Sequence, residues 1–342
     1  MQDGIVSRKE AHLRLSLSEG VRGAGASLGE VVLPYDACFC VAPGEMDYRT
    51  TVGGQGLLFP LVLGCMTGGT AAATAFNTAL RRCAQAFGIG LGLGSIRALL
   101  EDESLLETYG VGEVDWLYGN LGVSEIMRGV PAAAVREALS KLGACGLFVH
   151  LNILQEWLQP EGDRALWTDM ARLGAFVEAL GYPVIVKEVG SGFGGVASAR
   201  LGQLSIAGLE TSSRGGTSWV RVESCRGAWG GMAGEAVLSA LDGLGVEMPA
   251  AIRDCRRAMG DRSVIASGGI EDGAMLVKAL YLGADAVAVA QPLYRVWCES
   301  GEEGLLAYVE ALITCGRLVW RSTGARDLES LWRLRAECAP GD

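Results

Sequence analysis

The sequence predicts an α/β protein built as a (β/α)8 TIM barrel, with an N-terminal extension and C-terminal helices. Short apolar runs, each ending in Gly or a polar residue, alternate with longer stretches of helical periodicity, and this alternation indicates βαβ units. The eight runs span roughly 230 residues, and a barrel of this kind has about 250. The expected strands are residues 60–66, 89–94, 115–120, 146–152, 183–188, 204–210, 263–268 and 285–290.

The segments between these runs predict the helices. Most of the runs are apolar throughout, as parallel strands buried on both faces require. A doubly wound sheet is the alternative, but no opening strand leads into a GxGxxG turn with an acidic residue about 20 positions later. We expect a single domain, with an arm and cap over residues 1–56 and the barrel over 57–342. The expected helices are residues 71–87, 132–142, 168–180, 234–244 and 273–282, with closing helices over 303–334.

The composition excludes several classes of protein. Half of the 342 residues are hydrophobic, 20% are charged and the net charge is −10, which predicts a large core and no basic surface for nucleic acid. No apolar run reaches the 18 or so residues of a membrane helix, and the polar N-terminus has no secretory signal. Ten cysteines in such a chain are typical of reduced thiols, so we expect a cytoplasmic protein.

Polar residues gather where the expected strands end, which is where (β/α)8 barrels carry their active sites. Ser267-Gly-Gly269 and Ala290-Gln291 follow the last two strands, and backbone N–H groups there predict a phosphate site. Lys187 and Glu188 end another strand, and because successive side chains face opposite ways, we expect one of them to point into the barrel mouth. A cation there would stabilise an anionic flavin, whereas a structural ion pair between the two is the alternative.

Residues 150–164 form the segment that is richest in polar groups. His150 and Asn152 share a strand face, and Gln155 and Glu156 follow in the loop. A single carboxylate is how Mg²⁺ is held when substrate phosphates supply the other ligands, so Glu156 is a candidate ligand. The alternative is a polar loop with a capped helix start. The N-terminal sequence Arg8-Lys9-x-x-His12 is a second cationic cluster, either a clamp for a diphosphate or a solvated tail.

Together these motifs resemble those of the type 2 isopentenyl diphosphate isomerases, which are FMN-dependent (β/α)8 enzymes. The resemblance extends from Arg8 to about Leu334. It is carried by Arg8-Lys9-x-x-His12, Met66-Thr-Gly-Gly69, Gly94-Ser95-x-Arg97, Asn120-Leu-Gly122, residues 150–164, residues 183–190, residues 215–219 with Glu223, and Ser267-Gly-Gly269.

The resemblance implies a reaction and a set of site residues. The reaction interconverts isopentenyl and dimethylallyl diphosphate with reduced FMN and Mg²⁺, with NAD(P)H as the flavin reductant, in a homo-oligomer. The implied FMN contacts are Cys65, Met66, Thr67, Ser95, Asn120, Lys187, Ser212 and Thr217, with the FMN phosphate at Gly268, Gly269, Ala290 and Gln291. The implied substrate contacts are Arg8, Lys9, His12, Arg97, His150, Asn152 and Gln155, and Glu156 would bind Mg²⁺. The expected catalytic residues are Gln155, Lys187 and His150, with Gln155 relaying the second proton.

The sequence departs from the family pattern around the hydrocarbon part of the substrate. These departures leave open a paralogue that keeps flavin acid–base chemistry but isomerises or cyclises a longer prenyl or terpene substrate. An FMN-dependent 2-hydroxy-acid oxidase would need a His base within residues 263–270, which contain none, and a non-catalytic flavoprotein is a further alternative. The departures are Ile96 in place of Gln, Ala11 in place of an acid, Ser213 in place of Gly, Glu210 in place of Asp, and the histidine-free segment 35–40.

Overall fold

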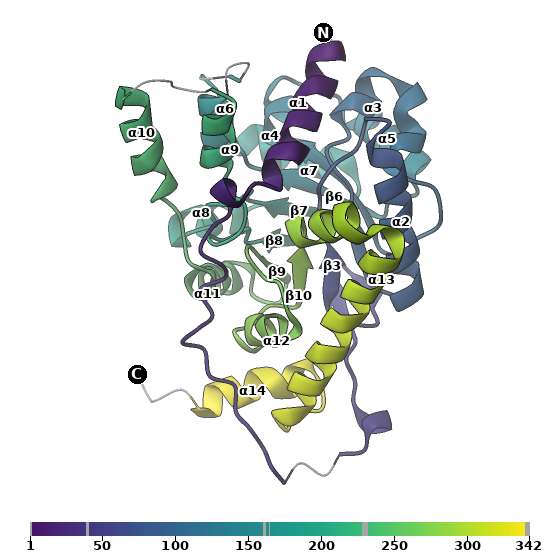
Figure 1. Cartoon of the computed structure of the whole chain (residues 1–342), viewed down its shortest axis with the longest axis vertical. Helices are drawn as coiled ribbons and strands as arrows, with labels where there is room; N and C mark the ends of the chain where they lie inside the picture. The colour runs from purple at the N-terminus through teal and green to yellow at the C-terminus, as the bar shows by residue number, and fades with distance from the viewer. Residues whose placement is uncertain (1, 39–40, 160–161, 164, 228–231, 339–342) are drawn as a thin grey trace.

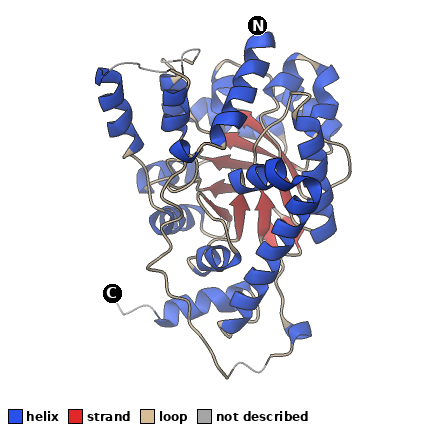
Figure 2. Ribbon diagram, in the orientation of Figure 1, coloured by secondary structure: helices blue, strands red, loops and turns tan. Residues whose placement is uncertain are grey.

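The centre of the molecule is a closed barrel of eight parallel strands, in the order β10-β3-β4-β5-β6-β7-β8-β9 (Figures 1 and 2). The computed structural model describes residues 2–38, 41–159, 162–163, 165–227 and 232–338. The predicted fold class is confirmed, and each strand lies within its expected segment except β5, which continues to Gly122. The strands are β3 Leu61–Leu63, β4 Gly90–Gly92, β5 Leu117–Gly122, β6 Gly146–His150, β7 Val184–Lys187, β8 Gly208–Glu210, β9 Ser263–Ser267 and β10 Ala286–Val289.

Helices surround the barrel on its outside (Figure 2). The five helices expected between strands are present within two residues of their predicted bounds, whereas the closing helices begin at Gln291 rather than at residue 303. The helices are α2 Ala73–Phe87, α3 Arg97–Glu101, η3 Glu103–Tyr109, α4 Val123–Met127, α5 Ala132–Leu142, α6 Ile153–Leu158, α7 Met170–Leu180, α8 Gly195–Gly202, α9 Trp219–Cys225, α10 Met232–Asp242, α11 Met248–Met259, α12 Gly273–Tyr281, α13 Gln291–Ser322 and α14 Leu328–Cys338.

Helix α11 lies outside the predicted helices, although its sequence carries the signal. Met248, Ala251, Ile252, Cys255 and Met259 are buried, and their three-to-four spacing is that of an apolar helix face. Four charged residues interrupt the apolar letters, so the segment does not stand out as an apolar stretch. Helix α11 packs on α8 and β9, and it therefore completes the outer wall of the barrel at the sixth βα unit, between β8 and β9.

The lower part of the barrel interior, toward the amino ends of the strands, is apolar and closed. The ring of Trp116, the residue just before β5, stacks on that of Tyr118 within β5 with centroids 4.0 Å apart, and Phe148 packs against both rings. A hairpin of β1 (Thr50–Val52) and β2 (Gln55–Leu57) covers this end, where the Trp116 indole N–H donates to the carbonyl of Val52 at 2.9 Å. Side chains therefore fill the barrel here, as in other barrels of eight strands.

The upper part of the interior is polar, although it is built on the same strands. Asn120, His150, Lys187, Glu210 and Ser267 each stand at the carboxyl end of a strand. Two residues earlier on each strand lies a position that faces the barrel interior. Because side chains two apart on a strand share a face, each of these polar side chains also faces inward. The register pairs Lys187 with both His150 and Glu210 on the neighbouring strands, which brings these groups to one level.

The N-terminal segment crosses the barrel mouth. Helix α1 (Gln2–Ser16) packs beside α9, and the short helix η1 (Glu19–Val21) follows it (Figure 1). The chain then binds two loops of the mouth, because Gly23 N donates to Gly216 O at 2.7 Å and Ala26 N donates to Gly269 O at 3.1 Å. It next runs down the outside through helix η2 (Pro43–Glu45) to the hairpin. Among the described helices, none combines the length and the apolar character that crossing a membrane requires.

Candidate active site at the barrel mouth

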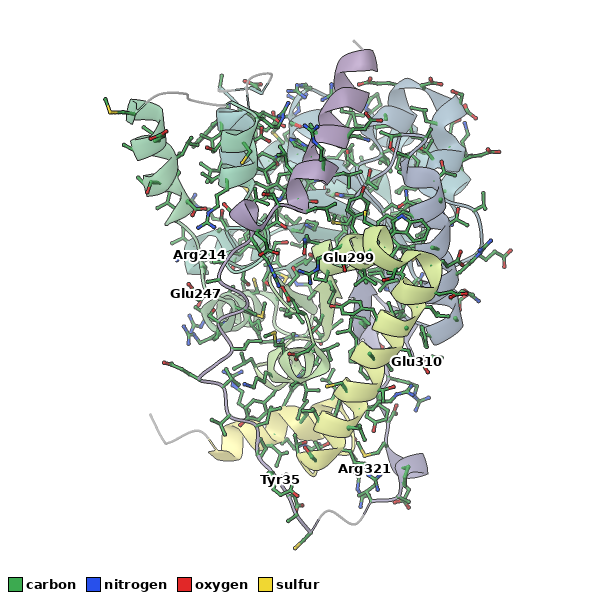
Figure 3. The ribbon with its side chains drawn as sticks, in the orientation of Figure 1. Tyr35, Arg214, Glu247, Glu299, Glu310 and Arg321 are labelled. Carbon is green, nitrogen blue, oxygen red and sulfur yellow. The ribbon has the colours of Figure 1, made fainter. Side chains whose placement is uncertain are left out.

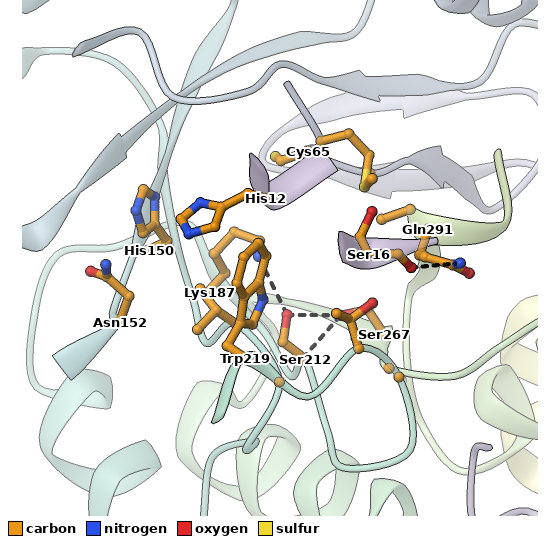
Figure 4. A pocket seen from close by; sticks show the side chains of 18 of the residues that line it. His12, Ser16, Cys65, His150, Asn152, Lys187, Ser212, Trp219, Ser267 and Gln291 are labelled. Carbon is orange, nitrogen blue, oxygen red and sulfur yellow. Dashed lines mark hydrogen bonds between the residues drawn. The ribbon is translucent and has the colours of Figure 1, made fainter. Parts of the chain in front are cut away.

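A cavity of about 290 Å³ opens at the carboxyl ends of the strands, beneath α1 (Figure 4). Every predicted site residue lines it except Arg8, which lies in α1 and whose side chain is outside the described part of the chain. The residues that it brings together are Lys9, His12, Cys65, Met66, Thr67, Ser95, Arg97, Asn120, His150, Asn152, Gln155, Glu156, Lys187, Ser212, Thr217, Gly268, Gly269, Ala290 and Gln291.

Glycines form one end of this cavity. Gly268 and Gly269 have φ angles of 114° and 78°, in the region that favours glycine. A Cβ on Gly269 would lie 2.6 Å from the carbonyl oxygen of Gly215, and one on Gly268 would collide with the backbone of Ser213. The N–H groups of Gly268 and Gly269 donate no hydrogen bond within the described residues. Two loops therefore meet backbone to backbone here, and their N–H groups suit a phosphate.

Lys187 points into the cavity and Glu188 points away from it. The Lys187 Nζ donates to the Glu188 carbonyl oxygen at 2.9 Å and to Ser212 Oγ at 3.3 Å, and it lies 3.7 Å from Glu210 Oε1. The Glu188 carboxylate instead accepts the four successive N–H groups of residues 189–192. Burial raises the pKa of Glu188 despite these four bonds. The two side chains use opposite faces of β7, as expected, and the alternative of an ion pair between them is wrong.

Ser212 and Cys65 complete the floor around Lys187. Ser212 is the one non-glycine residue of the described chain with a positive φ, 38°, and its Oγ lies 3.3 Å from Ser267 Oγ. This unfavourable backbone angle holds the hydroxyl between Lys187 and Ser267. Burial raises the pKa of the Cys65 thiol to about 12, so it is a neutral group in the floor and not a thiolate nucleophile.

Four polar side chains, from β5, from β6 and from the segment after β6, form a second group. The His150 Nδ1 lies 2.9 Å from Asn120 Oδ1, and because an amide oxygen only accepts, Nδ1 is the protonated nitrogen. The Glu156 carboxylate accepts from Asn152 Nδ2 at 3.1 Å and from the N–H of Asp163 at 3.3 Å. The Asn152 Oδ1 is buried and has no hydrogen-bond partner among the described residues. Two oxygen donors, one on Glu156 and one on Asn152, therefore lie close together on the cavity wall.

This group could hold a metal only with help from a ligand. Within the described residues, no cluster of three or more His, Cys, Asp or Glu side chains is arranged to bind a metal ion. Mg²⁺ is commonly held by one or two carboxylates together with substrate phosphates and water. The carboxylate of Glu156 and the unpartnered oxygen of Asn152 fit such a partial shell.

A network around Glu223 ties α1 to the site, and Glu223 enters the sequence argument only as part of a motif. The buried Glu223 carboxylate accepts from Gln155 Nε2 at 2.9 Å and from Arg226 Nη1 at 2.7 Å, and it lies 2.9 Å from His12 Nε2. Burial acts to raise the pKa of Glu223, but the hydrogen bonds from His12 and Gln155 and the nearby charges outweigh it and lower the pKa. The amide of Gln155 is thereby fixed, with its Oε1 as the end left for a ligand.

The predicted cationic clamp is partly engaged within the protein. The Lys9 ammonium donates to the carbonyl oxygens of Gly68 and Ser95, at 2.5 Å and 3.3 Å. The Arg97 guanidinium lies 3.1 Å from Glu101 and 3.2 Å from Glu125. These bonds hold α1 and α3 at the cavity rim, so an anionic ligand would share cations that already have partners.

Arg22 and Trp219 also line the cavity; the sequence assigns no role to Arg22, and it singles out Trp219 only as the end of a motif. The Arg22 guanidinium bonds both carboxylate oxygens of Glu271 at 2.5 Å, next to the Gly268-Gly269 turn. The Trp219 ring meets the His12 ring edge-on, with centroids 5.2 Å apart. Arg22 lies in the N-terminal arm, where no local pattern indicates that the chain returns to the mouth.

Comparisons with known proteins identify the family. The isopentenyl-diphosphate delta-isomerase of Mycolicibacterium vanbaalenii is 36% identical over 333 residues, covering 95% of this chain and 94% of the relative. The chain belongs to the type 2 isopentenyl-diphosphate delta-isomerase family. The isopentenyl-diphosphate delta-isomerase of Synechocystis sp. is 37% identical over 297 residues, covering 85% and 84% of the two chains. The family that the motifs resemble and the predicted enzyme class, an isomerase, are both confirmed.

Two further matches bear on the cofactor and the fold. The FMN-dependent dehydrogenase family matches residues 167–336. A mandelate oxidase structure with benzoyl-formic acid superposes with a TM-score of 0.63 at 16% identity, covering 96% of each chain, and this likeness shows the fold alone. The predicted cofactor FMN is supported by the match to the FMN-dependent dehydrogenase family.

The cavity fits FMN on its own geometry. The glycine turn offers backbone N–H groups for a phosphate, and Lys187 offers a buried cation at the floor. The Thr67 hydroxyl is buried on the wall, and no residue of the described ranges bonds it, so a polar ligand atom would satisfy it.

Proposed function

We propose that this isomerase interconverts isopentenyl and dimethylallyl diphosphate, using reduced FMN and Mg²⁺, with NAD(P)H as the flavin reductant. The observation that carries the proposal is that relatives named for this activity match 95% of the chain while the predicted site residues line one cavity. The cytoplasmic location, the homo-oligomeric state and the arm-and-barrel division at residue 57 remain predictions of the same proposal.

FMN would lie along the cavity from the glycine turn to Lys187. Its phosphate would bind at Gly268, Gly269, Ala290 and Gln291, where the turn meets the start of α13. Its ring would contact residues around Lys187 on the floor. These ring contacts would be Cys65, Met66, Thr67, Ser95, Asn120, Lys187, Ser212 and Thr217.

The substrate diphosphate would bind beneath α1. Lys9, His12 and Arg97, together with Arg8, would supply positive charge, and His150 would present its Nε2. Glu156 would hold Mg²⁺, with the buried Oδ1 of Asn152 beside it. The ion would help to neutralise the diphosphate, because Lys9 and Arg97 at the mouth already bond groups of the protein.

The residues around the alkene would control protons and exclude water. Reduced FMN, when bound, supplies an electron-rich surface for acid–base chemistry at the double bond. The amide of Gln155, oriented by Glu223, would place its Oε1 beside the reacting carbon and relay the second proton. Helix α1 covers the mouth, where Gln291 Nε2 donates to Ser16 O at 3.1 Å, and a dry cavity protects a developing carbocation.

Isotope exchange tests the proposal directly. Protein loaded with FMN, NADPH and Mg²⁺ should incorporate deuterium from D₂O into isopentenyl diphosphate and form dimethylallyl diphosphate. Normal flavin reduction without that product would contradict the proposal. Full activity in both Gln155→Ala and Glu156→Ala would favour a non-catalytic use of these residues instead.

A longer prenyl substrate is the second candidate, and a second cavity favours it. This cavity, of about 130 Å³, shares Gln155 and Trp219 with the first, so the two spaces adjoin. Leu154, Val220 and Leu241 give it an apolar side, and the Arg214–Glu247 ion pair stands at its edge (Figure 3). Such a space would accept carbon atoms that a five-carbon substrate does not have.

Product analysis with both substrates separates the two candidates. Under anaerobic conditions with reduced FMN, the enzyme is offered isopentenyl diphosphate and a longer prenyl diphosphate. Conversion of the longer compound alone would favour the second candidate. Leu241→Trp, which fills the second cavity, should then reduce turnover of the longer compound, and Leu238→Trp on the same helix but outside the cavity lining is its control.

A further inference from the structure

A buried carboxylate stands beside the cation of the site floor. Glu210, at the end of β8, is paired in the barrel register with Lys187 at the end of β7. Its Oε1 lies 3.7 Å from the Lys187 Nζ, and the two side chains are 5% and 10% exposed. This pair is therefore shielded from solvent, where charges act on their neighbours more strongly than at a surface.

Hydrogen bonds hold the carboxylate in place. Ser267 Oγ donates to Glu210 Oε1 at 2.8 Å, and Ser212 Oγ approaches the same oxygen at 3.4 Å (Figure 4 shows Ser212 between Lys187 and Ser267). Ser212 is the residue with the unfavourable positive φ, so the backbone is bent at the point where its hydroxyl joins the group. Three side chains, those of Glu210, Ser212 and Ser267, thus form one group with the Lys187 cation, although none of the roles assigned so far needs Glu210.

We propose that Glu210 is a positioning residue that acts through Lys187 and sets how strongly the site favours an anionic over a neutral reduced FMN. The proposal rests on the proposed contact between Lys187 and the FMN ring. A lone buried ammonium would favour the anion, and a carboxylate beside it cancels part of that preference.

The chemistry of reduction gives this balance a measurable form. Oxidised FMN takes up two electrons from a reductant, together with either one proton, which leaves the anion, or two protons, which leave the neutral form. A site with less net positive charge therefore takes up closer to two protons. A reduced flavin that retains the extra proton is also the form that can give one to an alkene, so Glu210 would bias the site toward acid chemistry.

The other titratable groups around Lys187 bond elsewhere or are neutral, which leaves Glu210 as its main charged partner. Glu188, next to Lys187, turns its carboxylate onto the N–H groups of residues 189–192. Cys65 is held neutral by its burial. His150, on the neighbouring strand β6, bonds Asn120 through Nδ1. Among the described residues, Glu210 is the acidic side chain that approaches the ammonium within ion-pair distance.

The decisive experiment uses the FMN-loaded protein without any substrate. Glu210→Gln keeps an oxygen for Ser267 Oγ to donate to, but removes the charge. At a fixed applied potential, we expect the ratio of reduced to oxidised FMN to rise about tenfold or more, as loss of one buried charge implies. The number of protons taken up per two electrons, read from the pH dependence of the midpoint potential, should fall.

Sulfite provides an independent measurement. Sulfite forms a bond from its sulfur to N5 of the oxidised ring, and the displaced electron pair leaves a negative charge on the ring. Glu210→Gln should therefore bind sulfite about tenfold more tightly or better. In the Lys187→Met background, the same change should have a much smaller effect, because the cation that transmits it is absent.

Two matched variants complete the design. Ser267→Ala removes the hydrogen bond but no charge, and it should change potential and sulfite affinity far less than Glu210→Gln. If Glu210→Gln fails to fold or to bind FMN, Glu210→Asp places the charge one methylene further from Nζ and should shift both readouts in the same direction by less. An FMN-loaded Glu210→Gln, or failing that Glu210→Asp, with wild-type potential, proton uptake and sulfite affinity overturns the proposal. Because no prenyl substrate is used, this outcome is distinct from failure of the isomerase assay.

Discussion

The two layers of the barrel interior use the same strands for different purposes. In the lower layer, Trp116, Tyr118 and Phe148 pack together in a space that the β1–β2 hairpin closes. In the upper layer, two residues further along, His150 and Lys187 face a cavity instead. A move of two residues along a strand thus changes the interior from a packed core to the wall of the candidate active site. Substitutions in the two layers should therefore separate stability from function.

Truncation in the lower layer should have the largest effect on stability. Trp116→Ala removes a fully buried ring, its stack on Tyr118 and its bond to Val52, and should lower the free energy of unfolding by about 3–5 kcal/mol. Denaturant titration measures this loss. FMN affinity of the folded variant should stay within about threefold of wild type. A loss of FMN binding in a still-folded Trp116→Ala would remove the distinction between the layers.

Substitution at the cavity should show the opposite pattern. Gln155→Leu is close in size but has no amide, so kcat should fall about 10²–10⁴-fold. The free energy of unfolding should change by no more than about 1–3 kcal/mol, the cost of leaving Glu223 without one hydrogen bond. Stopped-time product assays measure the first quantity and denaturant titration the second. Gln155→Asn keeps the amide but shortens the side chain by one methylene. An equal loss of activity in this variant would show that the position of the amide matters as much as its presence.

Substitution of Glu156, the proposed metal ligand, should have a smaller effect on activity, and that effect should depend on the Mg²⁺ concentration. Glu156→Gln removes the charge but keeps an oxygen beside Asn152, so the Mg²⁺ concentration needed for half-maximal activity should rise roughly 10–100-fold. High Mg²⁺ should restore most of kcat. The same variant should bind FMN normally. An unchanged Mg²⁺ requirement would place the metal elsewhere.

The sequence allows the barrel and most of the cavity lining to be predicted, because both follow from local patterns. Apolar runs mark the strands, and the polar residue that ends each run, such as Lys187, lies at the mouth by the geometry of parallel strands. The network around Glu223 cannot be derived in this way. It joins His12 to a carboxylate 211 positions later, and only the path of the arm brings them together. Helix α11 is a different case, since its periodicity is present but hidden among charged residues.

The same network gives the smallest predicted effect, and its sign follows from the lowered pKa of Glu223. A carboxyl whose pKa is lower in the folded than in the unfolded chain stabilises the fold at pH values above its ordinary value of 4.5. That contribution is lost as the pH falls through the lowered folded value. Glu223→Gln should therefore be less stable than wild type by about 1–3 kcal/mol near pH 7, with the difference shrinking below about pH 4.5. Denaturant titrations of both proteins from pH 3 to pH 7 measure it, with Glu101→Gln on the exposed rim as a control that should show little change. A difference that stays constant across this range would mean that the ionised Glu223 does not stabilise the attachment of α1, and that packing alone joins α1 to the barrel.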